Sequence, residues 1–298
     1  MKNFVKRFKI EKSYSFKKLT IYPVSLKSIK EKRDILTLDE ALKSKYLKIW
    51  EKEGGEVNSV IVENLSPKFI FLMAGELLTG CKQDRMVAYD CLLPPHSGKI
   101  YLRVYCTEQG RWTEKTKYFK GLNFAVNPKM RQIAKKTKSQ SRVWAEIEEK
   151  RETLQASPSE TGAFQSIFYD KQVQEKTKKY VKNLSDVFET SKDISGVVIV
   201  IGDEIICSDI FGYPSLFRKF WPKLLKGYVL EALDKEKTKS SISQENIENF
   251  LYYILKADYQ LGETDGVGKA LEIESNKIEG SALIYTQRVV HLDLFPQK

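Results

Sequence analysis

The residues best able to do chemistry lie between positions 75 and 112, in two polar clusters that each follow an apolar, strand-like run. The first cluster contains Glu76, Lys82, Gln83, Asp84 and Arg85, and the second contains Glu108, Gln109, Arg111 and Trp112. Polar groups at the end of a rigid strand can be held in a fixed mutual geometry, which a site requires. Carboxylates can transfer protons, and guanidinium and ammonium groups can bind phosphate. The alternative is that these charged residues form a solvated rim.

The composition is that of a soluble globular protein. The 298 residues are 42% hydrophobic and 30% charged, and a chain of this length can bury a large core. Its longest apolar runs, residues 69–74 and 197–201, are far shorter than the roughly 20 residues of a membrane-spanning helix. The first 14 residues interleave basic and apolar side chains and lack the continuous apolar segment of a signal peptide. We therefore expect a cytoplasmic protein without a membrane partner.

The four cysteines, Cys81, Cys91, Cys106 and Cys207, contain no C-x-x-C pair. A chain this long does not need disulfides to fold. Together with His96, the first three could supply soft ligands to zinc, but their spacing matches no common zinc module. We expect buried free thiols instead.

The two histidines lie in different contexts. His96 follows two prolines and precedes Ser-Gly, which predicts a surface turn. His291 lies in the alternating segment VVHLDLF, which predicts a hydrogen-bonded strand residue. Neither metal nor cofactor can be assigned from these residues.

The formal net charge of +11 favours anionic partners such as nucleotides, phosphorylated metabolites or nucleic acid. The excess is spread along the chain, and the lysine-rich runs at 135–138 and 176–179 are typical of solvated helix faces. No nucleic-acid-binding motif accompanies them. A high Lys and Glu content also fits a thermophile-like composition. An anionic small molecule is therefore the expected partner, and nucleic acid the least favoured one.

From about Phe16 to Phe124 the chain is rich in short strand-like runs separated by turn residues. The predicted strands cover residues 19–24, 59–63, 68–73, 86–93 and 99–106. One helix interrupts them, because Thr37 followed by Glu40 is the reciprocal capping pattern of a helix start. Short strands with turns at this spacing favour an antiparallel sandwich or barrel-like sheet over a parallel array.

The remainder of the chain alternates helical and strand-like patterns. Predicted helices begin near Gln140 and end before Pro158, then cover residues 164–188, 215–233 and 243–255. Pro222 is expected to bend the third of these helices or to mark its true start. Residues 196–201 and 204–211 predict a hairpin, and residues 269–273, 280–286 and 289–295 predict closing strands with a turn at 287–288.

These patterns predict an α+β protein, mostly antiparallel β-sheet in sandwich or barrel-like lobes, with helices from the middle and C-terminal thirds packed against it. We expect residues 1–298 to form one continuous unit. Within it, residues 1–127 form a β-rich lobe, residues 128–192 a helical one and residues 193–298 an α+β one.

Six unusual segments extend over most of the chain from Leu38 to Phe295: LDEALKSKYLKIWEKEGGEVNSVIVEN, AGELLTGCKQDR, VYCTEQGRW, SETGAF, FGYPSLFRKFWPKLLKGYVLEAL and GSALIYTQRVVHLDLF. With these segments the chain resembles a widely distributed family named for its genomic association with ADP-ribosylglycohydrolase and rhodanese-phosphatase proteins. The family's typical segment reads close to G-E-E-L-x-G-A-K-Q-N-R. This chain has Leu77, Cys81 and Asp84 in place of the second Glu, the Ala and the Asn. The resemblance implies a link to NAD or ADP-ribose metabolism by association.

Two main hypotheses follow. In the first, the chain is a hydrolase or transferase, or a binding protein, for a nucleotide-derived substrate. Its catalytic residues would be Glu76 and Glu108, with Lys82, Arg85 and Arg111 on phosphate, Gln83 and Gln109 on hydroxyl or amide groups, and Trp112 stacked on a ring. In the second, the same residues form a non-catalytic network of ion pairs that fixes the strand ends. A shared open hollow would favour the first, and mutual burial the second. A third, nucleic-acid binding, would require the basic residues to gather on one face.

Overall fold

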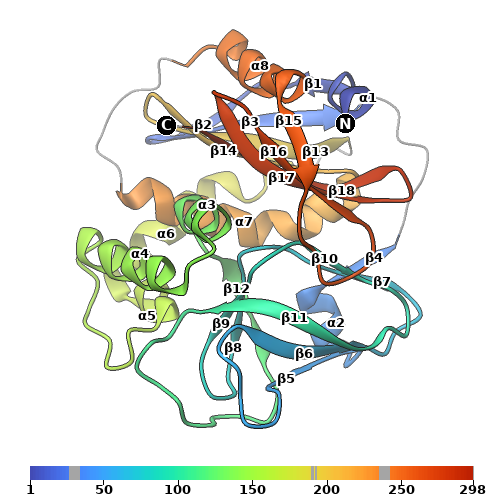
Figure 1. The fold of residues 1–298 in the computed structure, drawn as a ribbon. Helices are drawn as coiled ribbons and strands as arrows, with labels where there is room; N and C mark the ends of the chain where they lie inside the picture. The colour runs from blue at the N-terminus through green and yellow to red at the C-terminus, as the bar shows by residue number, and fades with distance from the viewer. Residues whose placement is uncertain (27–33, 189–190, 192, 235–241, 298) are drawn as a thin grey trace.

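The computed structural model describes residues 1–26, 34–188, 191, 193–234 and 242–297. Two β-sheet layers lie one above the other, with helices α3, α6 and α7 between them (Figure 1). Most strand pairs are antiparallel, so the predicted α+β class is confirmed. Both chain ends lie in the upper layer, on opposite sides of the view in Figure 1, because the first strands belong to the same sheet as the last ones.

The upper layer, which we call the large sheet, has the strand order β1-β3-β13-β14-β18-β17-β16-β15, with β2 also paired to β3. Its strands are β1 (Phe8–Ile10), β2 (Tyr14–Phe16), β3 (Leu19–Leu26), β13 (Ile194–Ile201), β14 (Glu204–Phe211), β15 (Asp258–Leu261), β16 (Lys269–Glu274), β17 (Ile278–Tyr285) and β18 (Arg288–Pro296). All eight residues of β13 are buried, because hydrophobic clusters pack on both faces of this sheet. This explains why the sequence of β13 is almost continuously apolar.

Two hairpins of the large sheet were predicted from the sequence. The β13–β14 hairpin turns at Gly202-Asp203, as expected. The β17–β18 turn consists of Thr286 and Gln287, one residue earlier than predicted, and both residues have positive φ (46° and 62°). A two-residue turn with positive φ at both positions matches the twist of the flanking strands, and here it forms without the favoured Asn-Gly pair.

The lower layer, which we call the curved sheet, has the order β12-β8-β9-β11-β6-β5. Its strands are β5 (Leu47–Trp50), β6 (Ser59–Asn64), β8 (Glu76–Thr79), β9 (Arg85–Val87), β11 (Gly98–Cys106) and β12 (Lys120–Ala125). The amide of Phe119, just before β12, donates to the carbonyl of Ile49 on β5 at 2.9 Å. This bond brings the two edges together, so that the sheet curves into a half-barrel around its own apolar core.

A small sheet joins the two layers. It consists of β10 (Cys91–Leu93), β7 (Phe69–Leu72) and β4 (Ile35–Thr37), and β4 pairs with β7 in parallel. Thr37 then caps α2 (Leu38–Lys43) through the predicted reciprocal bonds with Glu40. Residues 86–93 do not form the single predicted strand, because the chain leaves the curved sheet after β9 and enters the small sheet at β10. The break at residues 88–90 places the buried Asp90 in the wall of a pocket described below.

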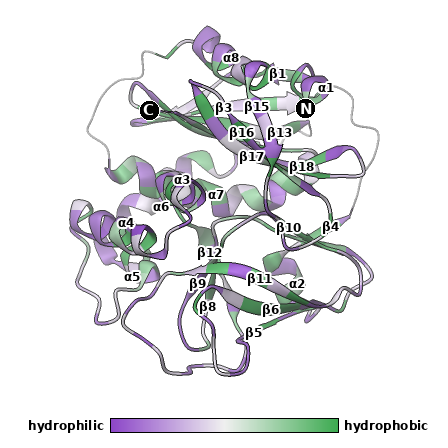
Figure 2. Ribbon diagram, viewed as in Figure 1, coloured by the Kyte–Doolittle hydropathy of each residue, from purple (hydrophilic) through white to green (hydrophobic). Residues whose placement is uncertain are grey.

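The helices fill the space between the layers and cover their ends. They are α1 (Lys2–Val5), α3 (Pro128–Thr137), α4 (Gln140–Thr153), α5 (Phe164–Tyr169), α6 (Lys171–Leu184), α7 (Pro214–Asp234), α8 (Gln244–Tyr252) and the short 3-10 turn η1 (Tyr253–Lys256). Figure 2 shows α3 and α4 with mixed hydrophilic and hydrophobic residues, as expected for helices that cover a core on one side only.

Two helix predictions need correction. Residues 164–188 form two helices instead of one, because Asp170 leaves the helical conformation and its carboxylate accepts bonds from the amides of Gln172 and Val173. These bonds start a new helix. Of the two alternatives for Pro222, the helix start is wrong, because α7 begins at Pro214 and Pro222 lies inside it; a bend at Pro222 stays a prediction.

Candidate functional site

The second predicted cluster is a buried ion-pair network. Glu108 is 1% exposed, and the Nε atom of Arg111 donates to one of its carboxylate oxygens at 2.8 Å. Thr161 donates to the other oxygen at 2.8 Å. Burial opposes ionisation of Glu108, but the bonds from Arg111 and Thr161 outweigh it and lower the pKa of this carboxyl. Arg111 also contacts Asp84 at 3.2 Å, so one guanidinium joins both predicted clusters.

The other predicted binding residues lie around this network and contact one another. Arg85 is fully buried and donates to the side-chain oxygen of Gln83 at 2.8 Å. Gln83 in turn donates to the carbonyls of Glu108 and Gln109. At the surface, the ammonium of Lys82 lies 5.3 Å from the centroid of the Trp112 ring, and the guanidinium of Arg85 lies 5.8 Å from it.

Glu76, the predicted acid or base, lies apart from this network. It is fully buried at the start of β8, where it forms an ion pair with Lys223 of α7 at 2.7 Å and accepts the amide of Met73 at 2.9 Å. Lys223 also pairs with Asp39 at 2.8 Å. Burial raises the pKa of Glu76, with Lys223 acting in the opposite direction. None of the eight predicted catalytic and binding residues lines the pocket described next.

A pocket of about 260 Å³ opens between α3 and the β16–β17 part of the large sheet. We call it the α3–β17 pocket. Its charged and polar lining comprises Asp90, Gln132, Lys135, Lys136, Lys138, Glu263, Glu272, Glu274, Glu279 and Ser281. Its apolar lining includes Tyr89, Leu271, Leu283 and Phe295. The lining therefore combines ammonium groups, carboxylates, hydroxyls and aromatic rings, which is the chemistry that polar metabolites require.

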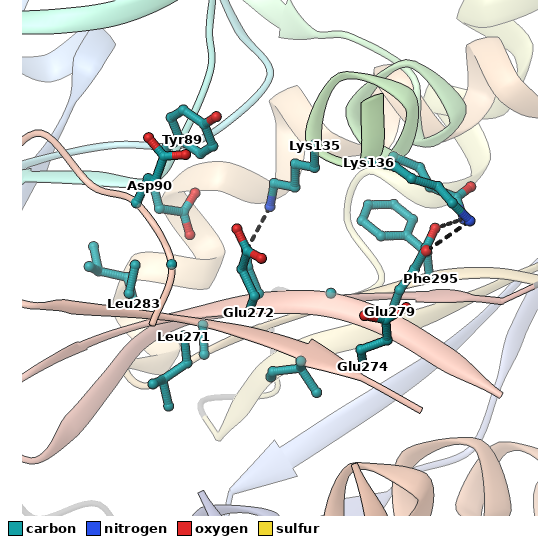
Figure 3. Close-up of a pocket in the computed structure, with 18 of the residues that line it drawn as sticks. Tyr89, Asp90, Lys135, Lys136, Leu271, Glu272, Glu274, Glu279, Leu283 and Phe295 are labelled. Carbon is teal, nitrogen blue, oxygen red and sulfur yellow. Dashed lines mark hydrogen bonds and ion pairs between the residues drawn. The ribbon is translucent and has the colours of Figure 1, made fainter. Parts of the chain in front are cut away.

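The lysines and the glutamates lie on opposite sides of the pocket. Figure 3 shows Lys135 and Lys136 on α3, facing glutamates on the strands below. Lys136 pairs with Glu279 at 3.1 Å, and Lys138 pairs with Glu272 at 3.3 Å. These lysines are about half exposed, so each pair contributes little stability, at most about 1 kcal/mol. A bound anion can therefore replace these glutamates as the partner of the ammonium groups at a small cost in free energy.

Lys135 is held more firmly than its neighbours. Its ammonium forms an ion pair with the buried carboxylate of Asp293 and a 2.8 Å hydrogen bond with the hydroxyl of Ser281. The Ser281 hydroxyl also donates to Asp293 at 2.8 Å. Lys135 and Ser281 both line the pocket, so this buried group supports one of its walls.

Asp90 is the member nearest the pocket in a series of buried charged groups that contact one another. His291 donates from Nδ1 to Asp90 at 2.7 Å and from Nε2 to Asp209 at 3.2 Å. Arg131 binds both oxygens of Asp209, at 2.6 and 2.7 Å. The amide of Ala74 donates to the other Asp90 oxygen at 2.9 Å. Asp90 is thus fixed from two directions while it faces the pocket.

His291 is positively charged between the two buried carboxylates. Burial opposes protonation, but Asp90 and Asp209 outweigh it and raise the pKa of His291 to about 9. The same pairing lowers the pKa of Asp90, because the His291 charge outweighs the effect of burial. At neutral pH all four buried groups are therefore ionised, so that positive and negative charges alternate from Arg131 through Asp209 and His291 to Asp90.

The local sequence explains how α3 supplies both the pocket and the series of buried charged groups. Arg131 and Lys135 are four residues apart, so they lie on one face of the helix, and Lys138 follows directly as the C-cap residue in the left-handed conformation. Gly75 makes room for this face: it has φ +90°, and a Cβ there would lie 2.7 Å from Cδ of Arg131. The expectation that residues 135–138 form a solvated face is wrong for Lys135, whose side chain is 15% exposed and bound to Asp293. The run at 176–179 is solvated as predicted at Lys176, Lys178 and Lys179.

The remaining sequence predictions concern histidine, cysteine and membrane association. The four cysteines are buried and free, as expected, and His291 is a hydrogen-bonded strand residue. Within the described part of the chain, no group of three or more His, Cys, Asp or Glu side chains is arranged to hold a metal ion. In the same residues, no helix has the length and hydrophobicity needed to cross a membrane.

The fold and the site together define a class: an α+β protein with two antiparallel sheet layers and a charged pocket where α3 crosses the large sheet. A family model matches residues 7–295, and the chain belongs to that family, described as the ARG and Rhodanese-Phosphatase-superfamily-associated Protein domain. This confirms the resemblance drawn from the sequence. Searches of curated proteins and of solved structures found no match.

Proposed function

We propose that the α3–β17 pocket binds a nucleotide-derived small molecule through its sugar-phosphate part. The observation that carries the proposal is the convergence of three α3 lysines and several carboxylates on one open pocket. Lysine ammonium groups bind phosphate, and carboxylates accept hydrogen bonds from sugar hydroxyls. The family name, which links the chain to ADP-ribosylglycohydrolase-associated proteins, supports a ligand of this class.

The charge of the lining narrows the ligand further. Three lysines face five carboxylates: Asp90, Glu263, Glu272, Glu274 and Glu279. A ligand with many negative charges would be repelled by the strand side, whereas one phosphate with several hydroxyl groups matches both sides. The volume of about 260 Å³ lies just below the roughly 300–1,000 Å³ of typical small-molecule pockets, which suits a ligand as small as a ribose phosphate. A larger ligand such as ADP-ribose would place its remaining parts outside the pocket.

A thermal-shift panel tests this proposal. Ribose 5-phosphate, AMP, ADP-ribose, NAD, ribose and inorganic phosphate are compared at equal concentration, because a ligand that binds only the folded state raises the melting temperature. We expect ribose 5-phosphate or ADP-ribose to give larger shifts than ribose or phosphate alone. Glu272→Gln should reduce these shifts, and Glu175→Gln on the outer side of α6 should not. Shifts equal for phosphate and ribose 5-phosphate would contradict the proposed sugar contacts.

A catalytic role is the second candidate, and the ionised series that ends at Asp90 favours it. We propose Asp90 as the carboxylate that stabilises a positive charge on the substrate, in a hydrolase or transferase reaction. Asp90→Asn removes this negative charge but keeps the size of the side chain, and thermal shifts with the same ligands show whether the variant still binds. If Asp90 stabilises the transition state in this way, turnover by a variant that still binds should fall by about 10²–10³-fold. Unchanged turnover of a confirmed substrate would contradict the role.

The assignments at the two sequence clusters remain predictions. For Glu108 and Arg111 we propose the structural role, since their charges are satisfied within the buried network. Glu76→Gln separates the two roles of Glu76: a catalytic role predicts lost turnover with normal stability, and a structural role predicts a lower melting temperature with normal ligand shifts. The second outcome is expected, because the substitution leaves Lys223 with a neutral neighbour.

A further inference from the structure

The outer face of strands β5, β6 and β11 in the curved sheet exposes an ordered set of aromatic and basic side chains. Side chains alternate along each strand, so that the buried ones enter the core of the half-barrel and the others point outward. We call the outward group the aromatic face. It comprises Lys48, Trp50, Ile61, Lys99 and Tyr101.

The strand register aligns the apolar members of this face. Trp50 on β5 lies opposite Ile61 on β6, which lies opposite Tyr101 on β11. Because neighbouring strands lie about 4.8 Å apart, the backbone positions of Trp50 and Tyr101 are roughly 10 Å from each other, with Ile61 between them. Tyr101 is 60% exposed and does not pack into the core on the other side of the sheet. Trp50 and Ile61 are partly exposed, and the Tyr118 ring packs edge-on against Trp50 with the two centroids 6.4 Å apart. A partly exposed aromatic row of this kind is typical of a binding surface.

The charges around the row are mostly positive. Lys99 places its ammonium 5.9 Å from the centroid of the Trp50 ring. The ammonium of Lys52 lies 5.6 Å from the centroid of the Tyr101 ring and is paired with Glu56. Lys48 and Lys99 occupy the row next to the aromatic one, with Glu63 between them. Neither lysine forms an ion pair with any residue that the structure describes. Their ammonium groups are therefore available to an external anion.

We propose that the aromatic face binds single-stranded nucleic acid, with bases stacked on Trp50 and Tyr101 and phosphates near Lys48 and Lys99. An open sheet that combines exposed rings with lysines provides both contacts that a single strand needs, namely a stacking surface and positive charge along the backbone. A duplex keeps its bases stacked on each other and cannot use the rings. The net charge of +11 adds a general attraction for polyanions. This surface is separate from the α3–β17 pocket, so the two proposals can fail independently.

Fluorescence anisotropy with a labelled oligouridine of about 12 nucleotides tests the stacking contacts. Tyr101→Ala should weaken binding by about tenfold, and Trp50→Ala should have a similar effect. Tyr252→Ala is the matched control, because Tyr252 on α8 is 51% exposed and has the ammonium of Lys256 5.3 Å from its ring. This control should bind as the unchanged chain does. Circular dichroism of each variant verifies that the fold is intact.

Salt dependence tests the phosphate contacts. The double variant Lys48→Gln/Lys99→Gln should reduce the slope of log affinity against log salt by about 1.4, since each phosphate contact on a single strand contributes about 0.7. Three results would each overturn the proposal: equal affinity for duplex and single strand, equal affinity of Tyr101→Ala and Tyr252→Ala, or no binding by the unchanged chain at low salt.

Discussion

The charge on His291 makes the stability of the fold depend on pH in a defined window. The pKa of His291 is raised to about 9 in the folded chain, from an ordinary value of 6.5. A raised pKa of a histidine means that the folded state binds the proton more tightly than the unfolded state. The stabilisation is therefore fully present below pH 6.5 and is lost as the pH rises through about 9.

The size of the effect follows from the shift. A rise from 6.5 to about 9 corresponds to about 3 kcal/mol, at about 1.4 kcal/mol for each pKa unit. About 2 kcal/mol of this should disappear between roughly pH 6.5 and pH 8.5, because the unfolded histidines lose their protons in this range while most of the folded ones keep theirs. This is a large part of the 5–15 kcal/mol or so that stabilises a typical domain.

Urea unfolding followed by tryptophan fluorescence measures this free energy across the pH window. The variant His291→Gln removes the charge, so its free energy of unfolding should be lower near pH 6.5 and nearly independent of pH up to about 8.5. The chain has only one other histidine, His96, which is exposed on a turn. His96→Gln is therefore the control, and it should keep the full pH dependence.

Two results would refute this reasoning. A free energy of unfolding that stays constant or increases between pH 6.5 and about 8.5 would show that the fold does not raise the pKa of His291. Equal pH dependence in His291→Gln and the unchanged chain would show that another group is responsible. NMR titration of the two histidine rings would then identify the group directly.

Two further substitutions test the buried network and the packing of α3. Arg111→Met leaves Glu108 buried without its main partner and should lower the free energy of unfolding by about 3–5 kcal/mol, measured by urea unfolding. Lys115→Met removes an exposed ammonium 3.9 Å from the same carboxylate and should lower it by less than about 1 kcal/mol. Equal losses in the two variants would contradict the burial of the Arg111–Glu108 pair. Gly75→Ala places a Cβ 2.7 Å from the Arg131 side chain at a positive φ and should lower stability by about 1–3 kcal/mol, and a melting temperature equal to that of the unchanged chain would show that α3 can move away freely.

The sequence predicted those parts of the fold that depend on local patterns. The capping pair Thr37 and Glu40, the Gly202 hairpin and the apolar β13 strand all follow from neighbouring residues, and all occur. The pairing of β3 with β13 does not follow from local patterns, because it joins residues that are distant in the sequence, such as Leu19 and Ile201. The sequence predicts one strand over residues 86–93, because their apolar character continues across the point where the chain changes sheets.

The candidate pocket was missed for the same reason. Its lysines come from α3, its glutamates from β16 and β17, and Asp90 from the break between β9 and β10. The sequence did contain one signal, the helical spacing of Arg131 and Lys135, but a basic stripe on a helix is more often solvated. The lysine excess likewise gave no reason to expect the aromatic face, which forms only when β5, β6 and β11 align.

The central claim is that the α3–β17 pocket binds a sugar phosphate through the lysines of α3, and calorimetric titration with ribose 5-phosphate tests it most directly. The double variant Lys136→Gln/Lys138→Gln is compared with Lys176→Gln/Lys178→Gln, which removes the same charge from the exposed side of α6. The account predicts that the first variant binds about tenfold more weakly than the unchanged chain and that the second binds equally well. Equal binding by both variants, or no binding by the unchanged chain, would contradict it.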